Sequence, residues 1–242
     1  MDTIKIKSKG VKMIAHRGVS GLERENTCPA FVAAGNRSYF GVETDVHRTR
    51  DGKFVIIHDT TTKRVSLEKY DINVEETDYS TISDIILPDL DGNTIRQDIR
   101  IPLLAEYISI CKKYGKKCVL ELKNHFEIED ISDMTEEIKE LGYLDNMIFI
   151  SFDLENCINL RKLLKDAQIQ YLKGKPVTDD VIDTLKKYRF DLDIGCIFLT
   201  KDVVKKVHAI GQKVNVWTCD KKDDAEKLIK MGVDYITTNI LE

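Results

Sequence analysis

The sequence predicts an α/β protein folded as a (β/α)8 TIM barrel, and three observations support that class. Eight short apolar segments alternate with amphipathic segments of helical periodicity along the 242 residues, which is the pattern of parallel strands joined by crossover helices. Polar residues follow the ends of these strands, where such barrels carry their active sites. No glycine-rich phosphate loop follows any strand, which disfavours nucleotide-binding forms of the rival fold, a doubly wound sheet.

Composition limits the class of protein further. The length suits one large barrel or two small domains, and since no boundary is evident we expect a single domain over residues 1–242. A net charge of -4 without a basic cluster among aromatic residues argues against nucleic acid as a partner. The six cysteines have no C-x-x-C or zinc spacing, and no apolar run is long enough to span a bilayer. We therefore expect a soluble cytoplasmic protein with reduced thiols and no stable membrane anchor.

The first predicted strand starts at residue 11 and ends abruptly at His16-Arg17-Gly18. A polar loop follows, and then a helix with Asn26 or Thr27 as its N-cap and Pro29 in its first turn. The next strand carries Glu43 and Asp45.

Residues 39–59 are predicted to form a β-hairpin. Asp51-Gly52 is a two-residue turn signal between two runs of strand-forming residues, so Arg50 is expected opposite Lys53.

Counting outward from that turn places Asp45 opposite His58, and Glu43 shares the face of Asp45 because side chains alternate along a strand. Two carboxylates and an imidazole should therefore converge. Carboxylate oxygens suit a hard divalent cation, and an imidazole suits acid–base chemistry near neutral pH. A surface hairpin with scattered charges would look similar, so this pattern alone does not establish a site.

Residues 60–101 lack regular periodicity and are predicted to form a small lobe inserted after the hairpin. Alternation then resumes at Pro102. The remaining helices are expected at 102–114, 129–141, 154–166, 179–188, 202–210 and 222–231. The remaining strands are expected at 118–123, 147–152, 169–172, 194–198, 213–217 and 235–239.

Other strand ends also carry candidate functional residues. Glu121 and Lys123 share one face of their strand, and burying this pair is unfavourable unless each group has a partner such as a cation or a phosphate. The alternative is a simple ion pair within the barrel. For His16 the alternative is a core histidine that caps its strand, and for Trp217 it is a side chain that only fills the barrel.

The joint order of these motifs resembles the glycerophosphodiester phosphodiesterase family. The motifs are His16-Arg17, Glu43-x-Asp45, His58-Asp59 and Glu121-Leu-Lys123, supported by 15–18, 25–27, 50–52 and 101–106. The similarity is dense from residue 11 to 125 and looser afterwards. Departures such as Arg24, Thr60-Thr-Thr62 and the last strand, which lacks the usual Asp and Pro, concern the headgroup of the substrate more than the chemistry.

The resemblance implies hydrolysis of glycerophosphodiesters to sn-glycerol 3-phosphate and an alcohol. It implies that a divalent cation, Mg²⁺ or Ca²⁺, is bound by Glu43, Asp45 and Glu121, and that His16 and His58 are the acid–base pair. It places substrate contacts at Arg17, Lys123 and Trp217, and it suggests a cyclic 1,2-phosphate intermediate. The pattern favours His58 as the base and His16 as the acid without deciding between the two assignments.

Two other functions remain open from the sequence. One is a lysophospholipase D-like or phospholipase C-like phosphodiesterase, which would need an apolar platform for acyl chains. The other is a non-catalytic binder of a polyol phosphate, which the intact His16 and His58 disfavour.

Overall fold

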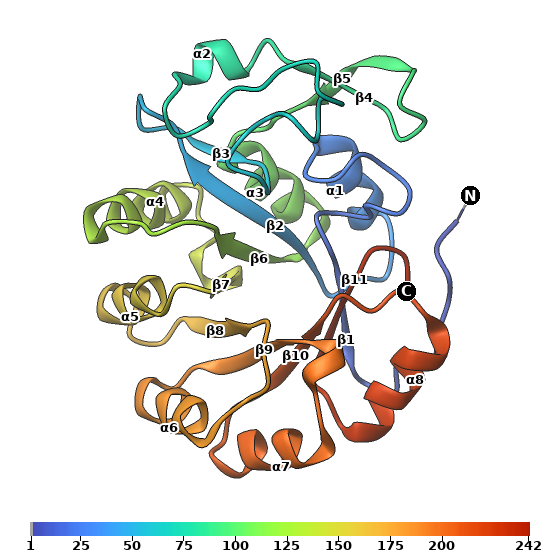
Figure 1. Ribbon diagram of the computed structural model, residues 1–242, viewed down its shortest axis with the longest axis vertical. Coiled ribbons are helices and arrows are strands. Elements are labelled where there is room, and N and C mark those ends of the chain that lie inside the picture. The colour runs from blue at the N-terminus through green and yellow to red at the C-terminus, as the bar shows by residue number, and fades with distance from the viewer. Residues whose placement is uncertain (1) are drawn as a thin grey trace.

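The computed structural model describes residues 2–242 and contains the predicted alternation of strands and helices. Eight parallel strands form one closed sheet, because the first strand pairs with both the second and the last. This closure confirms the TIM barrel and rules out the open doubly wound sheet (Figure 1). The barrel strands are β1 (Lys12–Ala15), β2 (Gly41–Arg48), β6 (Lys117–Leu122), β7 (Met147–Ser151), β8 (Gln168–Lys173), β9 (Asp191–Gly195), β10 (Val214–Trp217) and β11 (Tyr235–Thr238).

Helices connect the strands on the outside of the barrel. They are α1 (Cys28–Gly35), α3 (Leu104–Tyr114), α4 (Ile128–Glu140), α5 (Leu154–Leu163), α6 (Asp179–Tyr188), α7 (Lys201–Ala209) and α8 (Lys222–Met231), with a 3-10 turn η1 (Leu144–Asn146) before β7. Most boundaries lie within a few residues of those expected. No helix in the described part of the chain is long and apolar enough to cross a membrane.

One strand was predicted three residues too late. The apolar run Ile194–Phe198 suggested a strand, but β9 starts at Asp191 and the 3-10 turn η2 (Cys196–Phe198) follows it. The strand alternates polar and apolar residues, because its polar side chains point into a partly polar barrel interior. The apolar run was therefore a misleading signal.

The hairpin exists, but its register differs by one residue from the prediction. In β2 and β3 (Phe54–Ile56), Arg48 pairs with Phe54 and Ile57 N donates to Asp45 O at 3.1 Å, so Asp45 lies opposite Ile57 rather than His58. The connection contains three residues and ends at Gly52, whose φ of 80° is left-handed. Three-residue connections with such a glycine are common, and the Asp-Gly pair alone does not distinguish them from two-residue turns.

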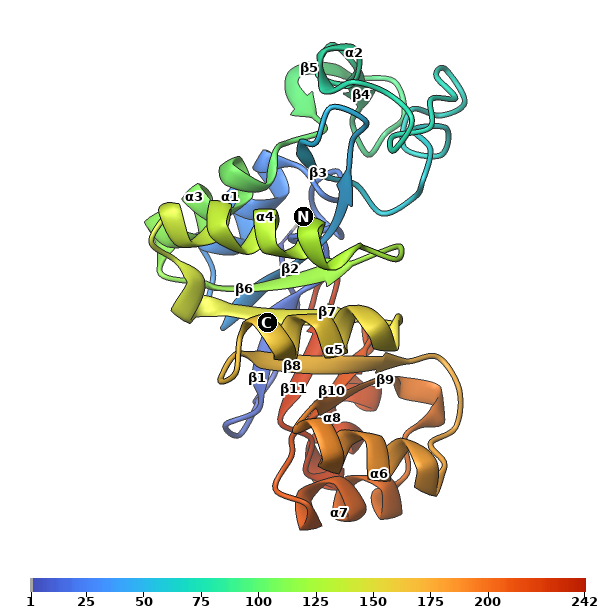
Figure 2. The ribbon, with the colours of Figure 1, turned by 90° about the vertical axis from the view of Figure 1, so that its left-hand side faces the viewer.

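Residues after the hairpin form a separate layer beside the barrel. It contains α2 (Tyr79–Ile82) and a two-stranded antiparallel sheet of β4 (Ile86–Pro88) and β5 (Ile95–Arg100). Figures 1 and 2 show it at one end of the long axis, next to β3. It has its own buried apolar cluster, which includes Ile82, Leu87 and Ile99.

The barrel interior is divided between apolar and polar side chains. One apolar cluster fills part of it, with Ile14, Val119 and Ile148 among its members. Polar or charged side chains are also buried on the barrel strands, among them Glu43, Asp45, Glu121, Gln170, Asp193, Asn215 and Thr237. Because such groups need partners when buried, their concentration locates the candidate site.

Candidate active site

A tight turn at the end of β1 positions the first two candidate residues. Arg17 and Gly18 have φ values of 52° and 78°, and a Cβ atom on Gly18 would lie only 2.6 Å from that of Ala30. Glycine is therefore required here. The turn brings the Arg17 backbone N–H to Glu43, where it donates to Oε2 at 2.9 Å.

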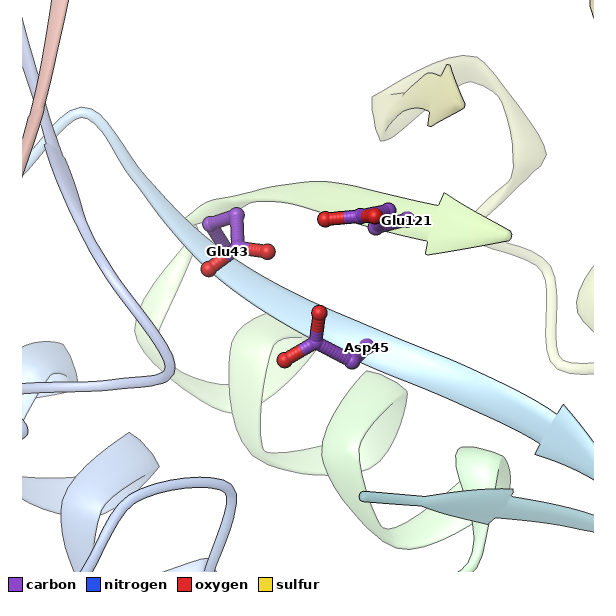
Figure 3. Close-up of side chains that lie close together, drawn as sticks. All are labelled: Glu43, Asp45 and Glu121. Carbon is purple, nitrogen blue, oxygen red and sulfur yellow. The ribbon is translucent and has the colours of Figure 1, made fainter. Parts of the chain in front are cut away.

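Three carboxylates meet on β2 and β6. Figure 3 shows Glu43, Asp45 and Glu121 pointing toward one another, and one oxygen of each lies within 4.8 Å of the others. All three side chains are buried. Asp45 and Glu121 are paired in the parallel ladder, which explains why they come from different strands yet lie side by side.

Two cationic side chains contact this cluster. Lys123 Nζ lies 2.8 Å from Glu121 Oε1 and 3.4 Å from Asp45 Oδ1, and Arg17 Nε lies 3.3 Å from Asp45 Oδ2. Asn26 Nδ2 donates to the same Asp45 oxygen at 2.8 Å. The cluster is therefore partly neutralised by groups that are held in place.

The cluster separates the pKa values of its members. Burial, followed by the neighbouring carboxylates, raises the pKa of Glu43 well above its usual range. Burial and Asp45 raise the pKa of Glu121 to about 7. Burial also disfavours charge on Asp45, but Lys123 and Arg17 outweigh it and hold the pKa of that carboxyl below its usual range. Three carboxylates this close repel one another unless a cation lies between them.

The donor set fits a divalent cation. Three buried carboxylates supply oxygen ligands, which Mg²⁺ and Ca²⁺ prefer. The cluster found among residues 2–242 contains no thiol or imidazole of the kind that would favour zinc.

Both candidate histidines are oriented through Nδ1. His16 Nδ1–H donates to Asn239 Oδ1 at 2.8 Å, and His58 Nδ1–H donates to Asp59 Oδ1 at 2.6 Å. Arg64 fixes Asp59 in turn, with Nε 2.6 Å from Oδ2. Burial lowers the pKa of both imidazoles. The Nε2 atom of each ring therefore remains for other partners, and that of His16 lies 3.9 Å from Glu43 Oε2.

A pocket of about 170 Å³ opens over these groups at the carboxyl ends of the strands. It brings together seven of the eight residues singled out from the sequence, and Asp45 lies directly beneath it in the carboxylate cluster. His58 reaches the pocket although the hairpin register was wrong, because it lies beyond the end of β3. The pocket is lined by His16, Arg17, Glu43, His58, Glu121, Lys123, Ile150, Phe152, Leu172, Asp193, Trp217, Thr218 and Thr237.

The model of one protein family, described as the glycerophosphoryl diester phosphodiesterase family, matches residues 16–242. The chain belongs to that family. This makes it a phosphoric diester hydrolase by class.

Relatives of the family support the assignment over nearly the whole chain. The glycerophosphodiester phosphodiesterase of Caldanaerobacter subterraneus subsp. tengcongensis is 28% identical over 232 residues, which cover 94% of this chain and 93% of that protein. A solved structure of an Oleispira antarctica phosphodiesterase in complex with the product sn-glycerol-3-phosphate has 27% identity and a TM-score of 0.87, covering 97% of this chain and 95% of that one. The glycerophosphodiester phosphodiesterase structure from Thermotoga maritima has 26% identity and a TM-score of 0.76, with 95% and 94% covered.

The sequence did not reveal the residues that hydrogen-bond to the pocket side chains and hold them in place. Asp59 was noted only as part of a motif and residue 239 only as the end of a predicted strand, and no sequence pattern shows that Asp59 and Asn239 bind the two histidines. Glu25 also had no assigned role, yet it accepts from Arg17 Nη1 at 2.7 Å. Asp193 was missed because its strand was placed too late, although the alternation of polar and apolar residues from 190 to 194 was a usable signal.

Proposed function

We propose that this protein hydrolyses glycerophosphodiesters to sn-glycerol 3-phosphate and an alcohol, using a divalent cation and two histidines. The observation that carries the proposal is the pocket itself, in which one carboxylate cluster, two imidazoles and two fixed cationic groups share a small space. The product bound in the Oleispira antarctica phosphodiesterase supports the choice of substrate.

Charge neutralisation is the first task of the site. A phosphodiester anion repels nucleophiles, and Arg17 and Lys123 would bind its non-bridging oxygens. Glu43, Asp45 and Glu121 would hold a divalent cation, which would supply further positive charge at the site. The ion pairs of Arg17 and Lys123 with the carboxylates keep both side chains at the pocket.

The two histidines would move the protons. We assign His58 as the base, because Asp59 accepts its Nδ1–H and leaves Nε2 free to take a proton. We assign His16 as the acid, because Asn239 accepts its Nδ1–H and the nearby Asp45 and Glu25 carboxylates partly offset the effect of burial, which helps Nε2 to carry a proton. Asp59 and Asn239 act as positioning residues that fix each ring.

We infer that the 2-hydroxyl of the glycerol moiety attacks phosphorus first and gives a cyclic 1,2-phosphate, which water opens in a second step. The described pocket lining contains no serine or cysteine, and neither Thr218 nor Thr237 is hydrogen-bonded to an imidazole. An attached hydroxyl also gains from proximity, with effective molarities of roughly 10⁵ M or more in well-oriented systems.

The purified protein should be assayed on a panel of glycerophosphodiesters with and without a chelator. Release of sn-glycerol 3-phosphate that depends on a cation would support the function. A 2-deoxy analogue of glycerophosphocholine should bind but barely turn over. Cleavage of this analogue at the rate of the parent would mean direct attack by water, and it would refute the cyclic intermediate while leaving the hydrolase function intact.

A lipid phosphodiester is the second candidate substrate. Phe152 on the pocket lining is 43% exposed, and Ile197, just after β9, is 82% exposed. Exposed apolar side chains of this kind could contact an acyl chain. Lysophosphatidylcholine in the same panel tests this, and a higher kcat/KM for it than for glycerophosphocholine would favour the lipid.

We also propose that the barrel and the lobe at about 60–101 form one domain. Arg64 of the lobe contacts Glu25, with Nη1 2.9 Å from Oε2, and Arg24 Nε donates to Pro88 O at 2.7 Å. The lobe thereby holds the loop that carries Glu25 and Asn26.

A further inference from the structure

A buried carboxyl group on the far wall of the pocket has no part in the chemistry above. Asp193 on β9 is 1% exposed and lines the pocket. Its Oδ2 accepts from Asn215 Nδ2 at 3.2 Å, whereas Oδ1 is buried and accepts no hydrogen bond from any described residue. Buried polar atoms without a partner are unfavourable. A free oxygen that faces a pocket is therefore suited to a ligand.

The position of Asp193 determines which part of a ligand it meets. In the closed order of eight strands, β9 lies four strands from β2, on the opposite side of the barrel from Glu43 and Asp45. Its neighbours on this wall are uncharged. Leu172 pairs with Asp193 in the ladder, and the Trp217 Nε1–H on the next strand also has no hydrogen-bond partner. A group bound here would lie away from Arg17 and Lys123.

A hydroxyl group matches this wall best. An ionised carboxylate accepts a hydrogen bond and a protonated one donates, and an alcohol hydroxyl can do either. Burial raises the pKa of Asp193 well above its usual range, which disfavours a cationic ligand as its partner. A phosphate is better served by Arg17 and Lys123, which supply positive charge elsewhere on the pocket lining.

We propose that Asp193 binds the terminal hydroxyl of the glycerol moiety, the one farthest from phosphorus, and so selects glycerol diesters over diesters of less hydroxylated alcohols. This inference rests on the proposed function, which places the phosphate beside Arg17 and Lys123. The glycerol carbon chain then runs across the pocket from Arg17 and Lys123 to β9. Asp193 is a specificity-determining residue and takes no part in proton transfer.

The test compares two substrates within each enzyme variant. Glycerophosphocholine is one, and the other has a methyl group in place of the terminal hydroxymethyl group but keeps the hydroxyl next to the phosphate. The wild-type protein should prefer glycerophosphocholine by about 10²-fold or more in kcat/KM, since a buried polar group that loses its hydroxyl partner discriminates strongly. In Asp193→Ala this ratio should fall to within a few-fold of one.

Two further variants complete the design. Asp193→Asn preserves the volume and should give an intermediate ratio, and it also serves if Asp193→Ala does not fold. Asp191→Asn is the matched control, because Asp191 lies on the same strand, is 7% exposed, and accepts from Lys213 N at 2.8 Å away from the pocket. It should keep the wild-type ratio.

An unchanged ratio in both Asp193 variants would overturn the hydroxyl site while leaving the hydrolase function intact. An equal loss of preference in Asp191→Asn would also overturn it, since the effect would then belong to β9 as a whole. If the wild-type protein cleaved neither diester in the presence of Mg²⁺ or Ca²⁺, the proposed function would fail and this inference would fail with it.

Discussion

The two walls of the pocket are built on different principles. On the wall formed by β1, β2 and β6, the charged and polar groups contact one another, as in the contacts of Lys123 with Glu121 and of Asn26 with Asp45. Arg17 Nε and Asp45 Oδ1 make no hydrogen bond, but they lie 3.3 and 3.4 Å from an opposite charge. On the wall formed by β8, β9 and β10, Leu172 provides apolar surface, while Asp193 Oδ1 and Trp217 Nε1 have no hydrogen-bond partner among the described residues.

This difference separates chemistry from selection. Charged groups must be held rigidly where negative charge develops, which their mutual bonds achieve before a substrate arrives. Unpaired polar groups instead gain their partner only when the right ligand binds, so they discriminate between ligands. We call the wall of β1, β2 and β6 the charged wall and the wall of β8, β9 and β10 the neutral wall. Changes on the charged wall are expected to lower kcat, and changes on the neutral wall are expected to alter KM or substrate preference.

The largest effect is expected from removing the cation. Exhaustive chelation should abolish turnover, and Mg²⁺ or Ca²⁺ should restore it, because three buried carboxylates would otherwise repel one another and the phosphate. Glu121→Gln should weaken cation binding, measured by calorimetry, with little change in Tm because the volume is preserved. Glu129→Gln, an exposed carboxylate on α4, is the control. Full activity after chelation would contradict the prediction.

The next largest effect is expected from the histidines. His16→Ala and His58→Ala should each lower kcat by about 10² to 10⁴-fold, the range for losing a positioned acid or base. The double variant should lose less than the product of the two effects, because the residues act together. His125→Ala is a matched control, since this exposed histidine also pairs with an aspartate but lies outside the pocket. Near-normal turnover in either active-site variant would make that histidine structural.

A smaller effect is expected from Asp59, which accepts a hydrogen bond from His58 but does not line the pocket. Asp59→Asn should lower kcat roughly 10- to 100-fold, by analogy with the loss of a carboxylate that orients a metal-bound histidine. KM should stay close to that of the wild type, because Asp59 binds the His58 ring and does not line the pocket.

The control for Asp59 is Asp153→Asn, which removes the carboxylate partner of His125 and part of the N-cap of α5. It should reduce Tm without changing kcat. A rise in KM alone for Asp59→Asn would show that Asp59 acts on substrate binding and that its orienting role is wrong.

The smallest effect is expected from Trp217. Trp217→Phe keeps an aromatic ring to pack against Phe152, whose ring centroid lies 5.6 Å away, but removes the unpaired Nε1–H. Losing one hydrogen bond to substrate corresponds to about 0.5–1.5 kcal/mol, so KM should rise by up to about tenfold. Steady-state kinetics should show an unchanged kcat. A fall in kcat with constant KM would place Trp217 with the charged wall instead.

The sequence alone predicted most of the architecture, and it singled out eight candidate site residues, seven of which line the pocket. Strand and helix periodicity is local, so seven of the eight barrel strands were placed within a few residues. Charged residues at strand ends were informative for the same reason, because side chains two apart share a face, as Glu121 and Lys123 do.

Pairing between distant segments was decided by the tertiary structure. The hairpin register depends on the conformation of its turn, and the start of β9 depends on which positions face a polar interior, so neither follows from local propensity. Closure of the barrel brings Asn239 of the last strand end to His16 of the first, 223 residues apart. Closure also places Asp193 opposite Glu43 and Asp45. The sequence specified which groups lie at the strand ends. The order of the strands in the closed barrel determines which side chains face each other across the pocket, and so which polar groups have a protein partner and which remain free for a ligand.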